Sequence, residues 1–218
     1  MNLQRIGAFI ASAAFVATIA AAPRSGKTPH KPKESVAVGG WTLETEQLDA
    51  ETQNGDFSSP VKVHLTRGDG STIDADRANG NYKRHQANLF GHVEIHDVSG
   101  TFGMKSAQNA PHQPATLATD ELRVDGTTRV YDAQGNVHYE QGESTAAADH
   151  ARLNDVTHRL DMDGKVHVVQ GDRTLFADRA TYDTVSGHGL AEGNVRMEFP
   201  GVTPVIATPK PITIKKIP

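Results

Sequence analysis

Acidic residues and histidines are the side chains of this chain that could carry chemistry. The 218 residues include 26 Asp or Glu, 11 His and no Cys, so thiol catalysis and disulfide bonds are ruled out. His92 and His96 are the nearest histidine pair, but four positions along a strand separate two side chains by about 13 Å, too far to share an ion. The segment 161–164 (DMDG) begins like a calcium loop but lacks its later ligands and closing Glu. The sequence therefore predicts no metal site and no cofactor.

Four aspartates recur at the spacing of a repeat. They are Asp76, Asp120, Asp149 and Asp178. General acid–base catalysis needs two differently tuned carboxyl groups in one cleft, whereas one aspartate per unit would form a ladder along the fold. The sequence also has no Gly-x-Ser-x-Gly nucleophile turn. We therefore expect no enzyme, and we expect these aspartates to accept hydrogen bonds from backbone N–H groups at successive corners.

A glycine stands 15 positions after each of these aspartates. The glycines are Gly91, Gly135, Gly164 and Gly193. Successive aspartates are 44, 29 and 29 residues apart, and the longest step contains an insertion within 97–115, whose Gly, Pro, Gln and Asn content is typical of a surface loop. A degenerate upstream copy has Glu46 in the aspartate place and Val61 in the glycine place. This periodicity predicts stacked copies of one two-strand unit.

Each glycine opens a run in which apolar and polar residues alternate, and a period of two indicates a strand with one buried face. The apolar positions change parity between Ala177 and Ala180, as they would at a bulge or corner. No segment after Lys33 keeps a helical period, so we expect an all-β fold of stacked antiparallel strands. The predicted inward-facing residues are Val61, Val63, Val93, Ile95, Val137, Tyr139, Val166, Val168, Val195, Met197 and Phe199.

The N-terminus has the pattern of an export signal. Arg5 precedes an apolar run over residues 6–22, and Pro23 ends it. The run is slightly short for a membrane span of about 20 residues. Residues 1–22 are therefore predicted to be a cleaved signal peptide or a retained membrane anchor helix. Either one places the rest of the chain outside the cytoplasm.

Three further segments follow. Residues 23–40 are predicted to be a flexible basic tether, 41–199 a β-repeat domain, and 200–218 a Pro-rich tail that frays or offers a last edge strand. With 22 basic and 26 acidic residues, the charge balance favours no nucleic acid partner.

The repeated unit, an Ala-Asp pair followed by Gly-x-Val, resembles the OstA-like (LptA–LptC) family of periplasmic lipopolysaccharide transport proteins. The strongest similarity lies in 177–199 (ADRATYDTVSGHGLAEGNVRMEF) and 73–96 (IDADRANGNYKRHQANLFGHVEIH). The separate motifs are short, so the resemblance depends on their recurrence at a fixed phase.

The resemblance implies a twisted β-jellyroll whose interior holds the acyl chains of lipopolysaccharide. The inward-facing residues given above would then bind lipid. It also implies edge strands that pair with other OstA-like export proteins and with further copies, head to tail. The expected function is that of an LptA-like protein carrying lipopolysaccharide through the periplasm, from the inner to the outer membrane.

Two alternatives stay open at this point. Segment 43–65 resembles the LptC branch, for which the apolar N-terminal run could serve as an inner-membrane anchor. Alternatively, the alternating residues form only a dry sandwich core in a structural β-repeat protein, because strand alternation is identical in both cases.

Overall fold

The computed structural model describes residues 34–100 and 113–199, and these form one antiparallel sheet of 15 strands without any helix. The predicted all-β jellyroll class is therefore confirmed. The predicted signal or anchor helix and the Pro-rich tail lie outside the described residues. The strands are β1 (Glu34–Val38), β2 (Trp41–Thr45), β3 (Asp49–Ala50), β4 (Asp56–Ser59), β5 (Val63–Arg67), β6 (Thr72–Ala75), β7 (Arg77–Asn81), β8 (Gln86–Asp97), β9 (Ala115–Asp125), β10 (Val130–Gln141), β11 (Ser144–Asn154), β12 (Arg159–Gln170), β13 (Arg173–Asp183), β14 (Gly189–Glu192) and β15 (Arg196–Glu198).

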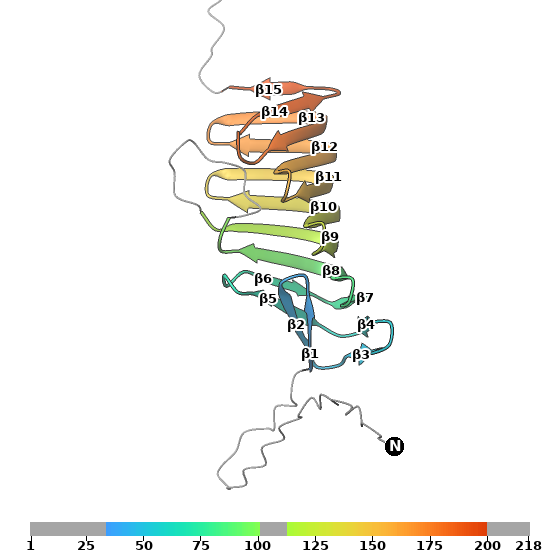
Figure 1. The fold of residues 1–218 in the computed structure, drawn as a ribbon. Helices are drawn as coiled ribbons and strands as arrows, with labels where there is room; N and C mark the ends of the chain where they lie inside the picture. The colour runs from blue at the N-terminus through green and yellow to red at the C-terminus, as the bar shows by residue number, and fades with distance from the viewer. Residues whose placement is uncertain (1–33, 101–112, 200–218) are drawn as a thin grey trace, which may run out of the picture. The chain divides into compact units, whose positions relative to one another are not determined.

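The strands stack in nearly the order of the chain, as Figure 1 shows for β8 to β13. The predicted insertion falls between the end of β8 at Asp97 and the start of β9 at Ala115. Strand β1 lies within the range predicted as a tether. It forms because Val36 and Val38 alternate with their neighbours and pair with Leu43 and Trp41 of β2.

Three of the long strands, β8, β10 and β12, bend at the repeated glycine. Gly91, Gly135 and Gly164 have φ of 73°, 80° and 78°, and the residue after each is also at positive φ. The strand register shifts at the same points, so two residues of one strand face one residue of the next. In β13, Ala177 and Ala180 on either side of the corner are both buried, which confirms the predicted change of parity.

The corner divides the sheet into two walls. The first wall contains β1, β2, β5, β6, β15 and segments 93–97, 115–119, 137–141, 144–148, 166–170 and 173–177. The second wall contains β3, β4, β7, β14 and segments 86–90, 121–125, 130–134, 150–154, 159–163 and 179–183. Buried residues of both walls form one hydrophobic cluster, so the walls face each other across a shared interior.

The aspartate 15 positions earlier explains why the corner residue is glycine. An added Cβ on Gly91 would lie 2.7 Å from Asp76 Oδ2, and one on Gly164 would lie 2.6 Å from Asp149 Oδ2. Any side chain at these glycines would therefore collide with the carboxylate on the neighbouring strand.

The partners of these carboxylates differ from the predicted backbone N–H groups. Each carboxylate is bonded instead to the side chain of the residue that follows the glycine. The pairs are His92 Nδ1 with Asp76 Oδ2 (2.7 Å), Asn136 Nδ2 with Asp120 Oδ2 (2.8 Å), Lys165 Nζ with Asp149 Oδ1 (3.4 Å) and Asn194 Nδ2 with Asp178 Oδ2 (2.9 Å). The side chain after the glycine reaches back across the corner because its own backbone is in the left-handed region.

The hairpin turns at the strand ends of the second wall, away from the corner, repeat with the same period. Asp125 Oδ1 accepts the N–H groups of Thr127 and Thr128, and Asn154 and Asp183 make the equivalent turns. The N–H of Thr128 lowers the pKa of the Asp125 carboxyl, and the N–H of Ser186 lowers that of Asp183. These side chains fix the hairpins that reverse the chain between corners.

The β1–β2 hairpin joins the two walls opposite the corner. Its turn contains Gly39, where an added Cβ would lie 2.5 Å from the Cα of Gly126 in the β9–β10 turn of the second wall. Trp41, beside this turn, is 1% exposed, and the guanidinium of Arg67 lies 4.9 Å from its ring centre. The interior is therefore closed at the N-terminal end of the sheet.

Candidate functional site

A row of apolar side chains runs along the inner face of the first wall from strand to strand. Each member pairs with the next across the sheet, and we call this set the first inner row. Its members are Val36, Leu43, Leu65, Ile73, Ile95, Leu117, Tyr139, Ala146, Val168, Leu175 and Met197. Leu43, Leu65 and Ile73 are fully buried, whereas Met197 at the other end is 53% exposed.

A second inner row faces it from the second wall. Its members are Leu89, Leu122, Ala133, Ala151, Met162, Ala180 and Ala191, again paired strand by strand. From Ala133 onward this row consists of alanine except at Met162. Small side chains leave room between the walls, and that room lies toward the C-terminal end of the sheet.

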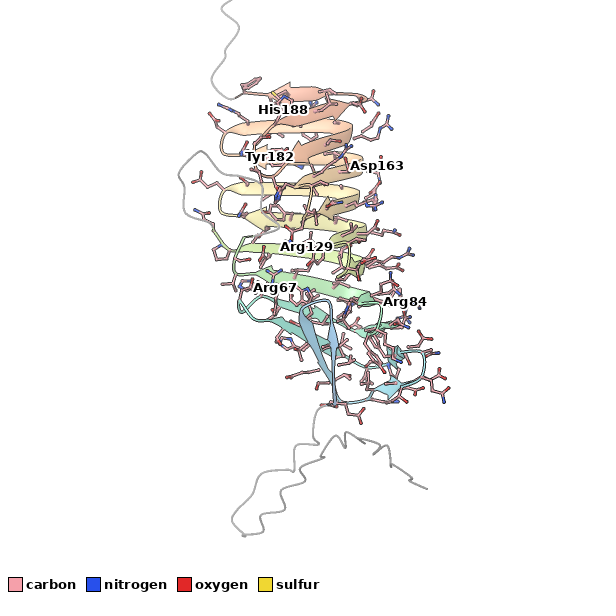
Figure 2. All side chains as sticks on the ribbon, in the orientation of Figure 1. Arg67, Arg84, Arg129, Asp163, Tyr182 and His188 are labelled. Atoms are coloured by element: carbon pink, nitrogen blue, oxygen red, sulfur yellow. The ribbon has the colours of Figure 1, made fainter. Side chains whose placement is uncertain are left out.

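Two cavities occupy this space. A small one of about 40 Å³ lies in the middle of the sheet and is lined by both walls, including Tyr139 and Ala146 of the first and Ala151 and Met162 of the second. A larger one of about 600 Å³ lies at the C-terminal end, where Val168, Leu175 and Met197 face Ala180 and Tyr182. Tyr182 is labelled in Figure 2. We call the two cavities together the lumen.

Apolar residues dominate the lining of the larger cavity, and its polar lining residues are Gln170, Arg173, Thr174 and Thr181. In the part of the chain that the structure describes, no group of three or more His, Asp or Glu side chains is arranged to hold a metal ion. Such a lumen suits the binding of an apolar chain whose polar end stays at the rim.

The predicted inward-facing residues fall into three groups. Val63, Val93, Ile95, Val137, Tyr139 and Val166 are buried between the walls, and Val168 is half-buried in the first inner row. Val195, Met197 and Phe199 lie on or beside β15 and are exposed, because no further strand covers them within the described residues. Val61 is half-buried before β5 and lines a polar hollow with Glu44, Lys62 and His64.

The second wall was missed as a source of lining residues. Leu122, Ala151, Leu153 and Met162 line the small cavity, yet none of them follows a repeated glycine. The signal that could have found them is the change of parity at the corner, which turns the alternating residues before each glycine inward as well.

The family model described as "LptA/(LptD N-terminal domain) LPS transport protein" matches residues 72–187 and 145–198, more than half of the chain. The chain belongs to this family. The two matched ranges overlap, as expected when one repeated unit can be aligned in more than one register. Both ranges leave out the N-terminal hairpin, so the closed end of this family member lies outside the match.

One solved structure with a similar fold is LptH, described as the LptA homologous periplasmic component of the lipopolysaccharide transport device from Pseudomonas aeruginosa. It is 16% identical, and the alignment covers 59% of this chain and 94% of LptH with a TM-score of 0.47. Comparison with curated proteins gives no match. Within residues 34–100 and 113–199, no helix has the length and apolar character needed to cross a membrane.

Proposed function

We propose that this chain is an LptA-like periplasmic protein that carries lipopolysaccharide between the inner and outer membranes, with acyl chains held in the lumen. Membership of a lipopolysaccharide transport family supports the class of cargo. The observation that carries the proposal is the lumen itself, which is apolar on both walls and reaches the C-terminal end of the sheet.

The lumen favours acyl chains for an energetic reason. Each methylene transferred from water to an apolar site contributes about 0.8 kcal/mol. Val168, Leu175, Met197 and Tyr182 offer such surface around the larger cavity. Arg173 at the rim provides a cation for the phosphate groups of the head group, which stays in water. The residues predicted as lipid-binding on the first wall then contact the acyl chains.

The C-terminal edge of the sheet is the proposed site for another OstA-like domain or a second copy, docked head to tail. β14 and β15 both pair with β13, and among the described strands none covers their outer edges. Leu190, Val195 and Phe199 expose apolar surface there, and Leu190 is 58% exposed. An unpaired strand edge bordered by apolar residues is the usual template for an added strand.

Photo-crosslinking in a lipopolysaccharide-producing host tests the proposal. A photoreactive residue at Val137 points into the lumen, and one at His138 points outward from the same strand, so the two form a matched pair. We expect lipopolysaccharide adducts at Val137 and none at His138, and native mass spectrometry of the purified protein should show bound lipid. Absence of lipid by both methods would refute the carrier proposal and favour a dry core.

A further inference from the structure

Met162 stands out in the second inner row. Its neighbours across the sheet are Ala151 on one side and Ala180 on the other, and the next members of the row are Ala133 beyond Ala151 and Ala191 beyond Ala180. Met162 is 6% exposed, so its side chain is held between the walls. A long unbranched side chain thus interrupts a strip of methyl groups.

Met162 also separates the two cavities. Among the described residues it is the one that lines both the small cavity and the larger cavity. The strands β13 and β14 lie between it and the C-terminal edge of the sheet, and strands are about 4.8 Å apart, which places Met162 about 10 Å inside the edge. Space that an entering chain could use therefore narrows at this side chain.

Beyond Met162 the lumen continues and then ends. Ala146, Ala148 and Ala151 line the small cavity, whose other lining residues are also apolar or tyrosine. At its far side Ile95 and Leu122 are almost completely buried, and Leu65, Ile73 and Leu89 in the core beyond them are fully buried. A chain that enters from the C-terminal end of the sheet therefore passes Met162 before it reaches the small cavity.

We infer that Met162 sets the depth to which an acyl chain enters the lumen, and hence the chain length that binds best. This inference rests on the proposed carrier function. Chains that end before Met162 gain affinity with each added methylene, about fourfold per group at 0.8 kcal/mol. Longer chains gain nothing further because their extra methylenes stay outside the constriction.

The test measures dissociation constants of the full chain for saturated fatty acids of increasing length. For the wild-type protein we expect affinity to rise with length and then reach a plateau. Met162→Ala joins the two cavities, and its plateau should move to longer chains, with at least a tenfold gain for the first lengths beyond the wild-type plateau. Met162→Leu conserves volume and should keep the wild-type plateau.

Met197→Ala is the matched control, because it shortens the other lumen methionine at the exposed mouth. It should weaken binding of all lengths alike without moving the plateau. If Met162→Ala does not fold, as thermal unfolding would show, Met162→Phe decides the question, since a larger side chain should move the plateau to shorter chains.

The outcomes separate the two proposals. An unchanged plateau in a folded Met162→Ala or Met162→Phe variant overturns the depth stop while leaving the carrier function intact. A wild-type protein that binds neither fatty acids of any length nor lipopolysaccharide overturns the carrier function itself.

Discussion

The corner glycine and its aspartate give a quantitative prediction. In Gly135→Ala the new Cβ would lie 2.5 Å from Asp120 Oδ2, and the backbone at φ 80° would remain in the left-handed region. That conformation costs about 1–2 kcal/mol for a residue with a Cβ. Relief of the collision requires the Asp120 side chain to move away from Asn136, which loses a hydrogen bond worth about 1 kcal/mol. We expect Gly135→Ala to reduce the free energy of unfolding by about 2–3 kcal/mol.

A double-mutant cycle in urea distinguishes the collision from backbone strain. Asp120→Ala alone should cost about 1 kcal/mol through the lost bond to Asn136. In the double variant the hydrogen bond is lost once and the carboxylate is absent, so the combined loss should fall short of additivity by about 1 kcal/mol. Additive losses, within about 0.5 kcal/mol, would refute the idea that the aspartate is what requires glycine at the corner. Gly171→Ala is the control, since its φ is also positive but no atom lies near the added Cβ.

Three more predictions follow from the repeat and the closed end. Lys165→Asn should raise the free energy of unfolding by about 0.5–1 kcal/mol, because Asn tolerates left-handed φ better than Lys and occupies two equivalent corners. A lower free energy of unfolding in urea would contradict this prediction. Folding lowers the pKa of Asp125 and Asp183, so the stability that these carboxylates contribute is complete above their unfolded pKa and is lost as pH falls below about 4. A variant with both residues changed to Asn should therefore lose less stability over that range when unfolding is followed in acid titrations. An unchanged acid transition would contradict the role of these carboxylates in stabilising the turns. Trp41→Ala should cost about 3–5 kcal/mol by urea unfolding, whereas Leu190→Ala at the exposed edge should cost less than about 1 kcal/mol; similar losses would mean that the two ends are equally packed.

The strands and corners could be predicted because they depend on local rules. The alternation after Gly135 requires Val137 and Tyr139 to share a face, and the constant distance between Asp120 and Gly135 requires the two to meet on neighbouring strands. The spacing of the repeat can be read directly from residue positions, so the all-β repeat fold could be predicted without knowing which distant segments contact each other.

Other features depend on which segments meet in space. Strand β1 lies in a range whose Lys, Arg and Pro content suggested a solvated tether, and it forms because β2 offers an edge to it. The contact between Gly39 and Gly126 joins two turns that no sequence period relates. In the sequence, Met162 belongs only to a segment that superficially resembles a calcium loop. Its position between Ala151 and Ala180 could not be predicted, because it exists only after β11, β12 and β13 have paired.

The role of the predicted lipid-binding residues stays a prediction, and these residues differ in whether they line the lumen. Val137 and Tyr139 line the lumen, as expected for contact with a chain inside it. Val61 lies by a polar hollow outside the lumen, because the degenerate copy to which it belongs breaks into short strands instead of one bent strand.

The close contact between Gly39 in the β1–β2 turn and Gly126 in the second wall has a consequence for how the protein unfolds. In a stack where each strand is stabilised by its neighbours, loss of order begins at the end with the weakest neighbour. Gly39 and Trp41 close one end, while β14 and β15 have four and three residues and, among the described strands, a neighbour on one side only. Within the described sheet we therefore expect fraying to start at the mouth of the lumen, and a partner docked there as proposed would also act as an end cap.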